Sequence, residues 1–180
     1  GEENVVAISV ENVLKPSRVP SGNMPGSTMS MFASTPATTY DFYPFAGIHR
    51  PVVLYSVPKT YLDDITVVTE ITGSDGVLKV NARINGASTG HGSVQIRGGE
   101  TLLRVPLTFL GGTSEATLIV PNAHLWSDKD PYLYDLTVTT EEDTYSLKVG
   151  IRTIAVDGGK ILLNGKPVKM NGYGRHEDFI

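Results

Sequence analysis

The stretch "DDITVVTEITGSDGVLKVNARING", residues 63–86, holds two extended segments separated by a turn signal. Apolar and polar residues alternate in both segments, and β-branched residues are frequent, as in half-buried strands. The break between them, Gly73-Ser74-Asp75-Gly76, suits a tight turn because glycine adopts positive φ angles at little steric cost. The stretch therefore predicts a β-hairpin with one face against a core.

The same pattern continues to residue 157, with short breaks rich in Gly, Ser and acidic residues. No window has a sustained helical period, so we expect an all-β chain. Roughly seven short strands with turn signals every ~8–12 residues are typical of a β-sandwich. The further strand-like segments are 92–98, 101–110, 115–121, 132–141 and 144–157.

A short hairpin is predicted in "KILLNGKPVKMNG", residues 160–172, because Asn164-Gly165 between two apolar runs is a strong local hairpin signal. On the N-terminal side, residues 5–13 and 50–57 have the pattern of strands. The residues between them, 15–39, are rich in Pro, Ser, Gly and Thr, which predicts a long loop of undetermined role. The pattern thus divides the chain into a β-rich N-terminal part, a sandwich and a C-terminal hairpin.

The composition limits the classes of partner. The chain has 180 residues, 40% of them hydrophobic, which is enough to form a core. A net charge of −4 disfavours nucleic acid and anionic membranes as main partners. The absence of cysteine and of a signal-like N-terminus predicts a cytoplasmic location. Because His49, His91 and His124 lack ligand spacing, we expect no metal, and nothing predicts an organic cofactor.

Three further stretches carry a resemblance to a known family. They are "YDFYPFAGIHRPVVLYSVPKTYLDDITV" (40–67), "PNAHLWSDKDPYLYDLTV" (121–138) and "VGIRTIAVDGGKILLNGKPVKMNGYGRHEDF" (149–179). Together, and in this order, they resemble glycoside hydrolase family 2, and within it the β-glucuronidases. One such string would be weak, whereas three in the right order across about two-thirds of the chain are specific.

The resemblance implies a domain organisation. Residues 1–57 would be the C-terminal part of a jelly-roll sugar-binding domain. Residues 58–152 would be an immunoglobulin-like β-sandwich, and residues 153–180 the truncated start of a catalytic (β/α)8 barrel. We therefore expect a fragment of a larger enzyme, which would be inactive by itself.

The resemblance also implies an activity. The parent protein would be a retaining hydrolase of terminal β-glycosides, using two glutamates that lie beyond this chain, and a homo-oligomer. β-Glucuronides are favoured as substrates because "AGIHRPV" and "GYGRHED" look more like glucuronidase than galactosidase sequence. Two alternatives stay open: a β-galactosidase of the same family, and a stand-alone β-sandwich module that binds carbohydrate or protein without catalysis.

The candidate site residues follow from the same motifs. Asp41 and His176 match substrate-binding residues of the family, with Arg175 and Glu177 in supporting positions. A carboxylate accepts sugar hydroxyls and a histidine donates to them, which suits both for this task. Retaining glycosidases need two carboxyl groups about 5 Å apart. Because the resemblance places both glutamates beyond this chain, no residue of the chain is expected to be catalytic.

Other polar and aromatic residues have structural interpretations. The acidic residues 63–64 and 141–143 are expected to be solvated at turns and strand edges. Trp126, the only tryptophan, together with Tyr132 and Tyr134 resembles a sugar-stacking platform. Packing in the core or at a domain interface is favoured for Trp126, because its neighbours belong to a structural stretch of the family.

Overall fold

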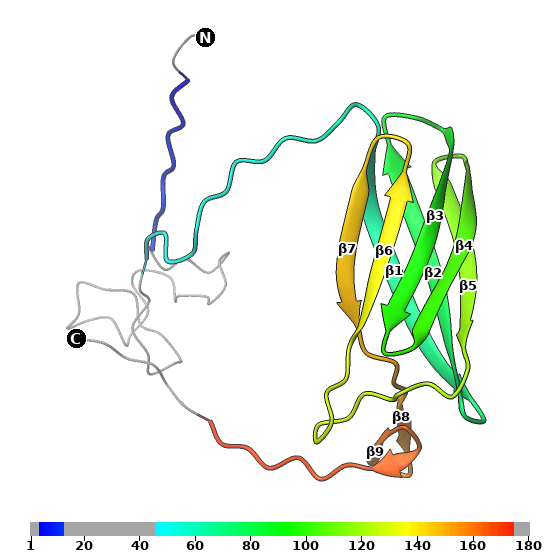
Figure 1. Ribbon diagram of the computed structural model, residues 1–180. Helices are drawn as coiled ribbons and strands as arrows, with labels where there is room; N and C mark the ends of the chain where they lie inside the picture. The colour runs from blue at the N-terminus through cyan, green and yellow to red at the C-terminus, as the bar shows by residue number, and fades with distance from the viewer. Residues whose placement is uncertain (1–3, 13–45, 175–180) are drawn as a thin grey trace, which may run out of the picture. The chain divides into compact units, whose positions relative to one another are not determined.

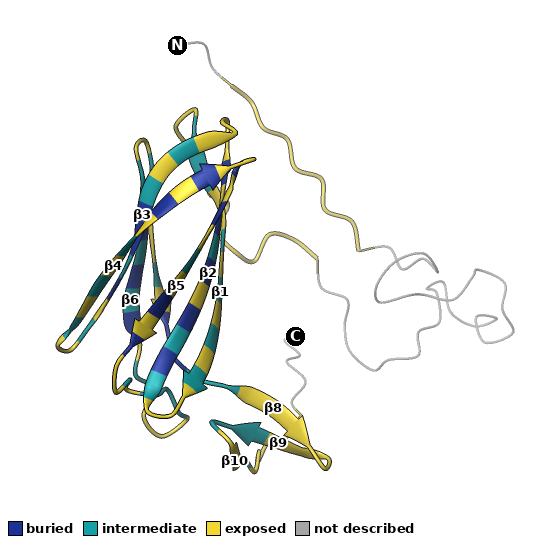
Figure 2. Cartoon of the chain, turned by 90° about the vertical axis from the view of Figure 1, so that its right-hand side faces the viewer, coloured by how far each residue is buried: buried dark blue, intermediate teal, exposed yellow. Residues whose placement is uncertain are grey.

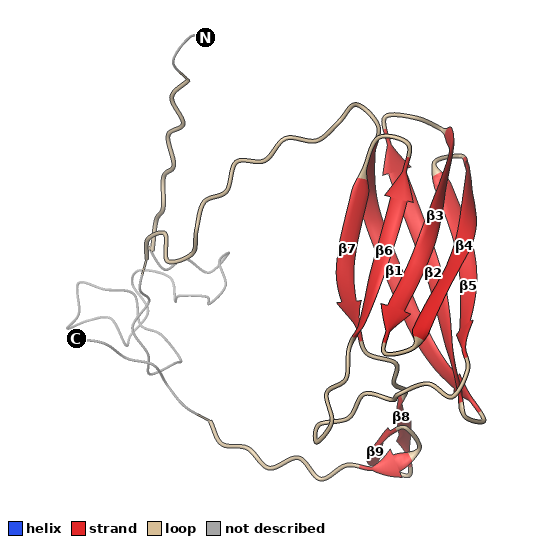
Figure 3. Cartoon of the chain, in the orientation of Figure 1, coloured by secondary structure: helices blue, strands red, loops and turns tan. Residues whose placement is uncertain are grey.

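The computed structural model describes residues 4–12 and 46–174. Contacts divide the chain into two compact units, and the larger one, Tyr55–Asn171, contains every strand of the described part. Figure 3 shows strands and loops, and no helix occurs among the described residues. Consequently no described helix is long and apolar enough to span a membrane.

The larger unit is built on seven antiparallel strands (Figure 1). Their order is β1-β2-β5-β4-β3-β6-β7. Strands β4 and β5 share one register pair, Leu110 with Thr113. The sheet therefore divides there into two layers, one of β1, β2 and β5 and the other of β4, β3, β6 and β7. The bounds are β1 (Tyr61–Thr72), β2 (Asp75–Asn85), β3 (Thr89–Gly98), β4 (Thr101–Leu110), β5 (Thr113–Val120), β6 (Tyr134–Thr140) and β7 (Thr144–Val149).

The core lies between these two layers. Buried and exposed residues alternate along the strands, which Figure 2 shows as bands of buried residues. Burying one large apolar side chain contributes about 1.5–3 kcal/mol, so this alternation determines which face of each strand turns inward. The sandwich predicted from the period-2 pattern is confirmed, as is the all-β, immunoglobulin-like fold class. The innermost side chains are Leu78, Ile96, Leu107, Phe109, Leu118, Leu136 and Ile151.

A small second sheet follows the sandwich. It contains β8 (Ile154–Asp157), β9 (Lys160–Leu163) and β10 (Lys166–Pro167). Asn164 and Gly165 connect β9 to β10 with φ angles of 50° and 75°. These are the positive values that a two-residue hairpin turn of type I′ requires, so the hairpin predicted from Asn-Gly is confirmed.

Two predicted strands on the N-terminal side are wrong. Residues 5–12 and 50–57 have no strand assignment in the structure. A strand is stabilised by a paired neighbour and by burial of one face, and Val6 and Leu54 are 81% and 98% exposed. Their β-branched pattern is therefore not accompanied by the burial that stabilises a strand.

A third prediction needs correction, because residues 144–157 form two strands instead of one. The chain leaves the ladder at Gly150, where an added Cβ would lie 2.8 Å from Cγ of Trp126. The carbonyl of Ile151 then accepts a hydrogen bond from Trp126 N (2.9 Å), and the Ile151 side chain is fully buried. Pairing with the loop before β6 thus replaces pairing with a strand.

Candidate functional site

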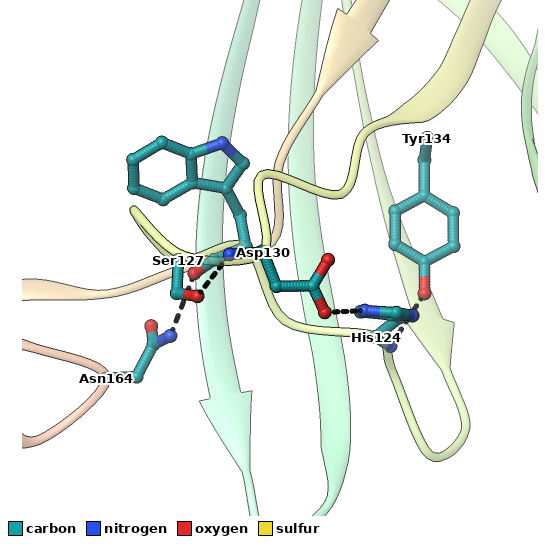
Figure 4. A network of polar contacts seen from close by, with 6 residues as sticks. His124, Ser127, Asp130, Tyr134 and Asn164 are labelled. Atoms are coloured by element: carbon teal, nitrogen blue, oxygen red, sulfur yellow. Dashed lines mark hydrogen bonds and ion pairs between the residues drawn. The ribbon is translucent and has the colours of Figure 1, made fainter.

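The four site residues predicted from the sequence lie outside the described residues. Asp41 precedes residue 46, and Arg175, His176 and Glu177 follow residue 174. Their roles therefore stay predictions. The described part of the chain brings its polar and aromatic side chains together elsewhere, between the loop 121–133 and the turn of the small hairpin (Figure 4).

Trp126 packs at the end of the sandwich. The indole is half-buried and lies against Gly150, and the guanidinium carbon of Arg152 stands 4.6 Å from the ring centroid. A cation over the ring occupies one of the two faces on which a sugar would stack. Trp126 is thus a packing residue at the edge of the sandwich. The prediction allowed packing in the core or at a domain interface, and the core position is wrong.

Asn164 connects the small hairpin to this loop. Its Nδ2 donates to the carbonyl oxygen of Trp126 (3.0 Å), and its Oδ1 accepts from Thr153 N (2.9 Å). Its own N–H donates to the carbonyl of Thr153 (2.9 Å). One side chain therefore fixes the hairpin, the residues after β7 and the Trp126 loop relative to one another.

His124, Asp130 and two tyrosines form an adjoining cluster. His124 Nε2 lies 2.6 Å from Asp130 Oδ2, and its ring stacks on Tyr132 with centroids 4.2 Å apart. The Tyr134 hydroxyl accepts a hydrogen bond from His124 N (2.8 Å). Burial raises the pKa of the Tyr134 phenol above its ordinary value, so this group stays neutral at physiological pH.

This cluster is not a catalytic triad although it contains Ser, His and Asp. In a triad the histidine lies between the serine hydroxyl and the carboxylate. Here Ser127 Oγ accepts from the backbone N–H of Asp130 (3.0 Å), while the His124 ring bonds the Asp130 side chain. Serine and histidine thus both fix the loop.

The acidic residues expected to be solvated are partly engaged. Asp143 is half-buried, and its carboxylate accepts from Leu62 N (2.9 Å) and Thr144 N (2.8 Å). Asp63 pairs with Arg83 at 2.7 Å. The sequence missed both because the partners, Leu62 and Arg83, are brought into reach only by the fold. Neither acid forms a carboxyl pair suited to glycoside hydrolysis.

A metal site is likewise not apparent in this part of the molecule. Among the described residues, no group of three or more His, Asp or Glu side chains is placed to hold an ion. The contacts of the described cluster are hydrogen bonds and ring stacking, which hold the loop in place.

Asn164 gives a prediction on stability. Asn164→Ala removes both side-chain hydrogen bonds and places a less suitable residue at φ 50°, where asparagine is tolerated. We expect the free energy of unfolding to fall by about 1–3 kcal/mol and the Thr153 amide to lose protection from hydrogen exchange. Asn164→Gly is the matched control, because it keeps the backbone conformation and loses only the side-chain bonds, so its loss should be smaller. Wild-type exchange at Thr153 in the alanine variant would contradict the role of Asn164.

Comparison with known proteins identifies the family. The model of "Glycosyl hydrolases family 2" matches residues 60–152. β-Glucuronidase of Rattus norvegicus is 39% identical over 191 residues, covering 96% of this chain and 28% of the rat protein. The chain thus spans less than a third of the length of this relative.

Solved structures agree with this match. A β-glucuronidase from an uncultured Clostridium species superposes with a TM-score of 0.75 at 32% identity, over 91% of this chain and 26% of that one. The β-glucuronidase of Ruminococcus gnavus in complex with D-glucuronic acid gives 0.56 at 31% identity, over 64% of this chain and 20% of that one. On the strength of the family match across the whole sandwich, the chain belongs to family 2 of the glycosyl hydrolases.

Proposed function

We propose that the whole protein is a β-glucuronidase, a retaining glycoside hydrolase that releases terminal β-glucuronic acid. The observation that carries this proposal is the 39% identity with a β-glucuronidase across 96% of the chain. The chain supplies the immunoglobulin-like sandwich, preceded by part of a jelly-roll domain and followed by the start of the catalytic barrel. The fold of the sandwich itself does not discriminate among glycosides, so the sugar preference rests on this identity.

The reaction divides between parts of the protein. Two glutamates outside these 180 residues act as acid/base and nucleophile, one protonated and the other ionised. Asp41 accepts and His176 donates hydrogen bonds to sugar hydroxyls, while Arg175 and Glu177 hold the first barrel loop in place. The sandwich positions these elements and takes no part in bond cleavage.

Assays of the full-length protein test the proposal. We expect turnover of 4-nitrophenyl β-D-glucuronide and a lower kcat/KM for the corresponding β-D-galactoside. The 180-residue chain alone should show no turnover, because it lacks the catalytic pair. A preference for the galactoside would support the β-galactosidase alternative. Hydrolysis by the isolated chain would contradict the assignment of the glutamates to other segments.

The assembly state is a separate part of the proposal. Most oligomers of soluble proteins are symmetric assemblies of one chain. We expect the full-length protein to be a homo-oligomer. Size-exclusion chromatography with light scattering measures its mass, and a monomeric mass at micromolar concentration would contradict this expectation.

A further inference from the structure

A groove lies between the loop after β5 and the turn of the small hairpin. Residues 125–129 line one side of it, and residues 163–169 line the other. Its volume is about 680 Å³, within the range of about 300–1,000 Å³ typical of small-ligand sites. The Asn164 side chain fixes the two walls relative to each other through its bond to the Trp126 carbonyl (Figure 4). The groove is therefore held open by defined contacts.

Three of the four charged residues that line the groove are positive. Lys129, Lys166 and Lys169 line it together with a single acid, Asp128. This is a local reversal in a chain whose net charge is −4. Cations converging on one hollow attract anions, most strongly at low ionic strength.

These lysines differ from other lysines of the sandwich. Lys79 and Lys148 each lie 2.6 Å from an acid, Glu70 and Asp135 respectively. The three lysines of the groove form no ion pair with any other described residue. Within residues 4–12 and 46–174, no acid neutralises their charges.

Other side chains that line the groove are apolar, namely those of Leu125, Leu163, Pro167 and Val168. Apolar and cationic side chains in one groove are complementary to a ligand that has an apolar face and anionic groups at its edge. A sugar ring has a face of C–H groups, and a uronate or a sulfated sugar adds the anion.

An acidic peptide is a poorer match. Peptides often bind by adding a strand to a sheet edge. Of the two residues in the edge strand β10, Pro167 has no backbone N–H to donate, and the N–H of the next residue, Val168, already donates to the carbonyl of Ile161 (2.9 Å). Main-chain pairing with an incoming peptide is therefore restricted at this edge.

We infer that this groove is a binding site for an acidic saccharide, with the lysines pairing to its carboxylate or sulfate groups and the apolar side chains contacting a sugar face. The inference rests on the proposed function, because a protein that acts on uronides meets saccharides with such groups. The groove is lined by other residues than those proposed to contact the cleaved sugar.

The test is an NMR titration of the 180-residue chain with three probes. They are a hyaluronan hexasaccharide, which carries carboxylates, a chondroitin sulfate hexasaccharide, which adds sulfates, and a neutral N-acetylglucosamine hexasaccharide. We expect the two acidic probes to shift the amides of Leu125, Leu163 and Val168, and the neutral probe to leave them unchanged. Comparison of the two acidic probes shows which anion the lysines prefer.

A double variant and a charge-matched control isolate the groove. Lys129→Ala/Lys166→Ala should weaken binding by roughly 3- to 30-fold, as expected for two exposed charge contacts. Lys79→Ala/Lys148→Ala makes the same change in net charge away from the groove and should bind as the wild type does. Melting curves of both variants verify that the fold is intact.

Several outcomes would overturn the inference. Equal weakening in the control pair would assign the binding to net charge alone. Shifts with the neutral probe as large as with the acidic ones would remove the role of the lysines. Binding of poly-glutamate in the absence of hyaluronan or chondroitin binding would assign the groove to a peptide. The aryl glucuronide assay of the full-length protein does not depend on any of these three outcomes. Failure of the inference about the groove and failure of the proposed function are therefore distinguishable.

Discussion

Phe109→Ala should lower the free energy of unfolding by about 3–5 kcal/mol, as expected when a buried aromatic side chain is truncated. Phe109 lies on β4, is 1% exposed, and is the largest of the fully buried side chains. Its ring approaches β3 at Gly92, where an added Cβ would lie 3.4 Å from Cε2 of Phe109. The loss combines the transfer energy of the ring with the cavity that it leaves, because strands on both sides restrict collapse.

Leu110→Ala is the matched control for this prediction. Leu110 is the next residue on the same strand, but its side chain is 69% exposed. We expect a change within about 0.5 kcal/mol, as for most surface substitutions. Urea denaturation followed by circular dichroism measures both variants. A similar loss for the two would mean that the inward and outward faces of β4 are wrongly assigned.

The sandwich could be predicted because its determinants are local. Along β2, Leu78, Val80, Ala82 and Ile84 are buried at every second position, which is the period that the sequence displays. The turn at Asn164 was equally legible, since positive φ angles at two successive residues favour Asn-Gly strongly. In both cases a few neighbouring residues carry the information.

Other features could not be predicted because distant residues determine them. The break between β7 and β8 depends on Trp126. Its side chain fills the space beside Gly150, and its backbone N–H donates to the Ile151 carbonyl. Within the segment itself, Gly150 is the signal of this break, because an isolated glycine weakens a strand. The structural use of Asp143 depends on the N–H of Leu62, a residue 81 positions away.

The same difference between local and distant determinants applies to the prediction of the candidate site. The motif resemblance identified the family, which the match over residues 60–152 bears out. It did not indicate the lysine-lined groove, because Lys129 belongs to the loop after β5 and Lys166 and Lys169 to the hairpin. Such a site exists only once Asn164 has joined the two segments.

A second large effect is expected on catalysis. In the full-length protein, Asp41→Ala and His176→Ala should each lower kcat/KM for an aryl β-glucuronide by about 30- to 1000-fold, or roughly 2–4 kcal/mol. The two residues are far apart in the sequence. A polar substrate needs donors and acceptors that converge from several sides of an open barrel mouth, so residues from two domains are expected to share one pocket.

The physical reason for a loss in kcat/KM lies in the transition state. We expect distortion of the sugar ring toward the oxocarbenium-like geometry to bring its hydroxyls into line with Asp41 and His176, so that these proposed bonds strengthen as the reaction proceeds. Steady-state kinetics beside a thermal melt separates this effect from unfolding. His91→Ala and Asp157→Ala are suitable controls, because both residues are exposed in the described part of the chain and should leave the kinetics unchanged. Wild-type kcat/KM for both Asp41→Ala and His176→Ala, with unchanged melting temperatures, would show that the motif resemblance assigns these two residues to the wrong task.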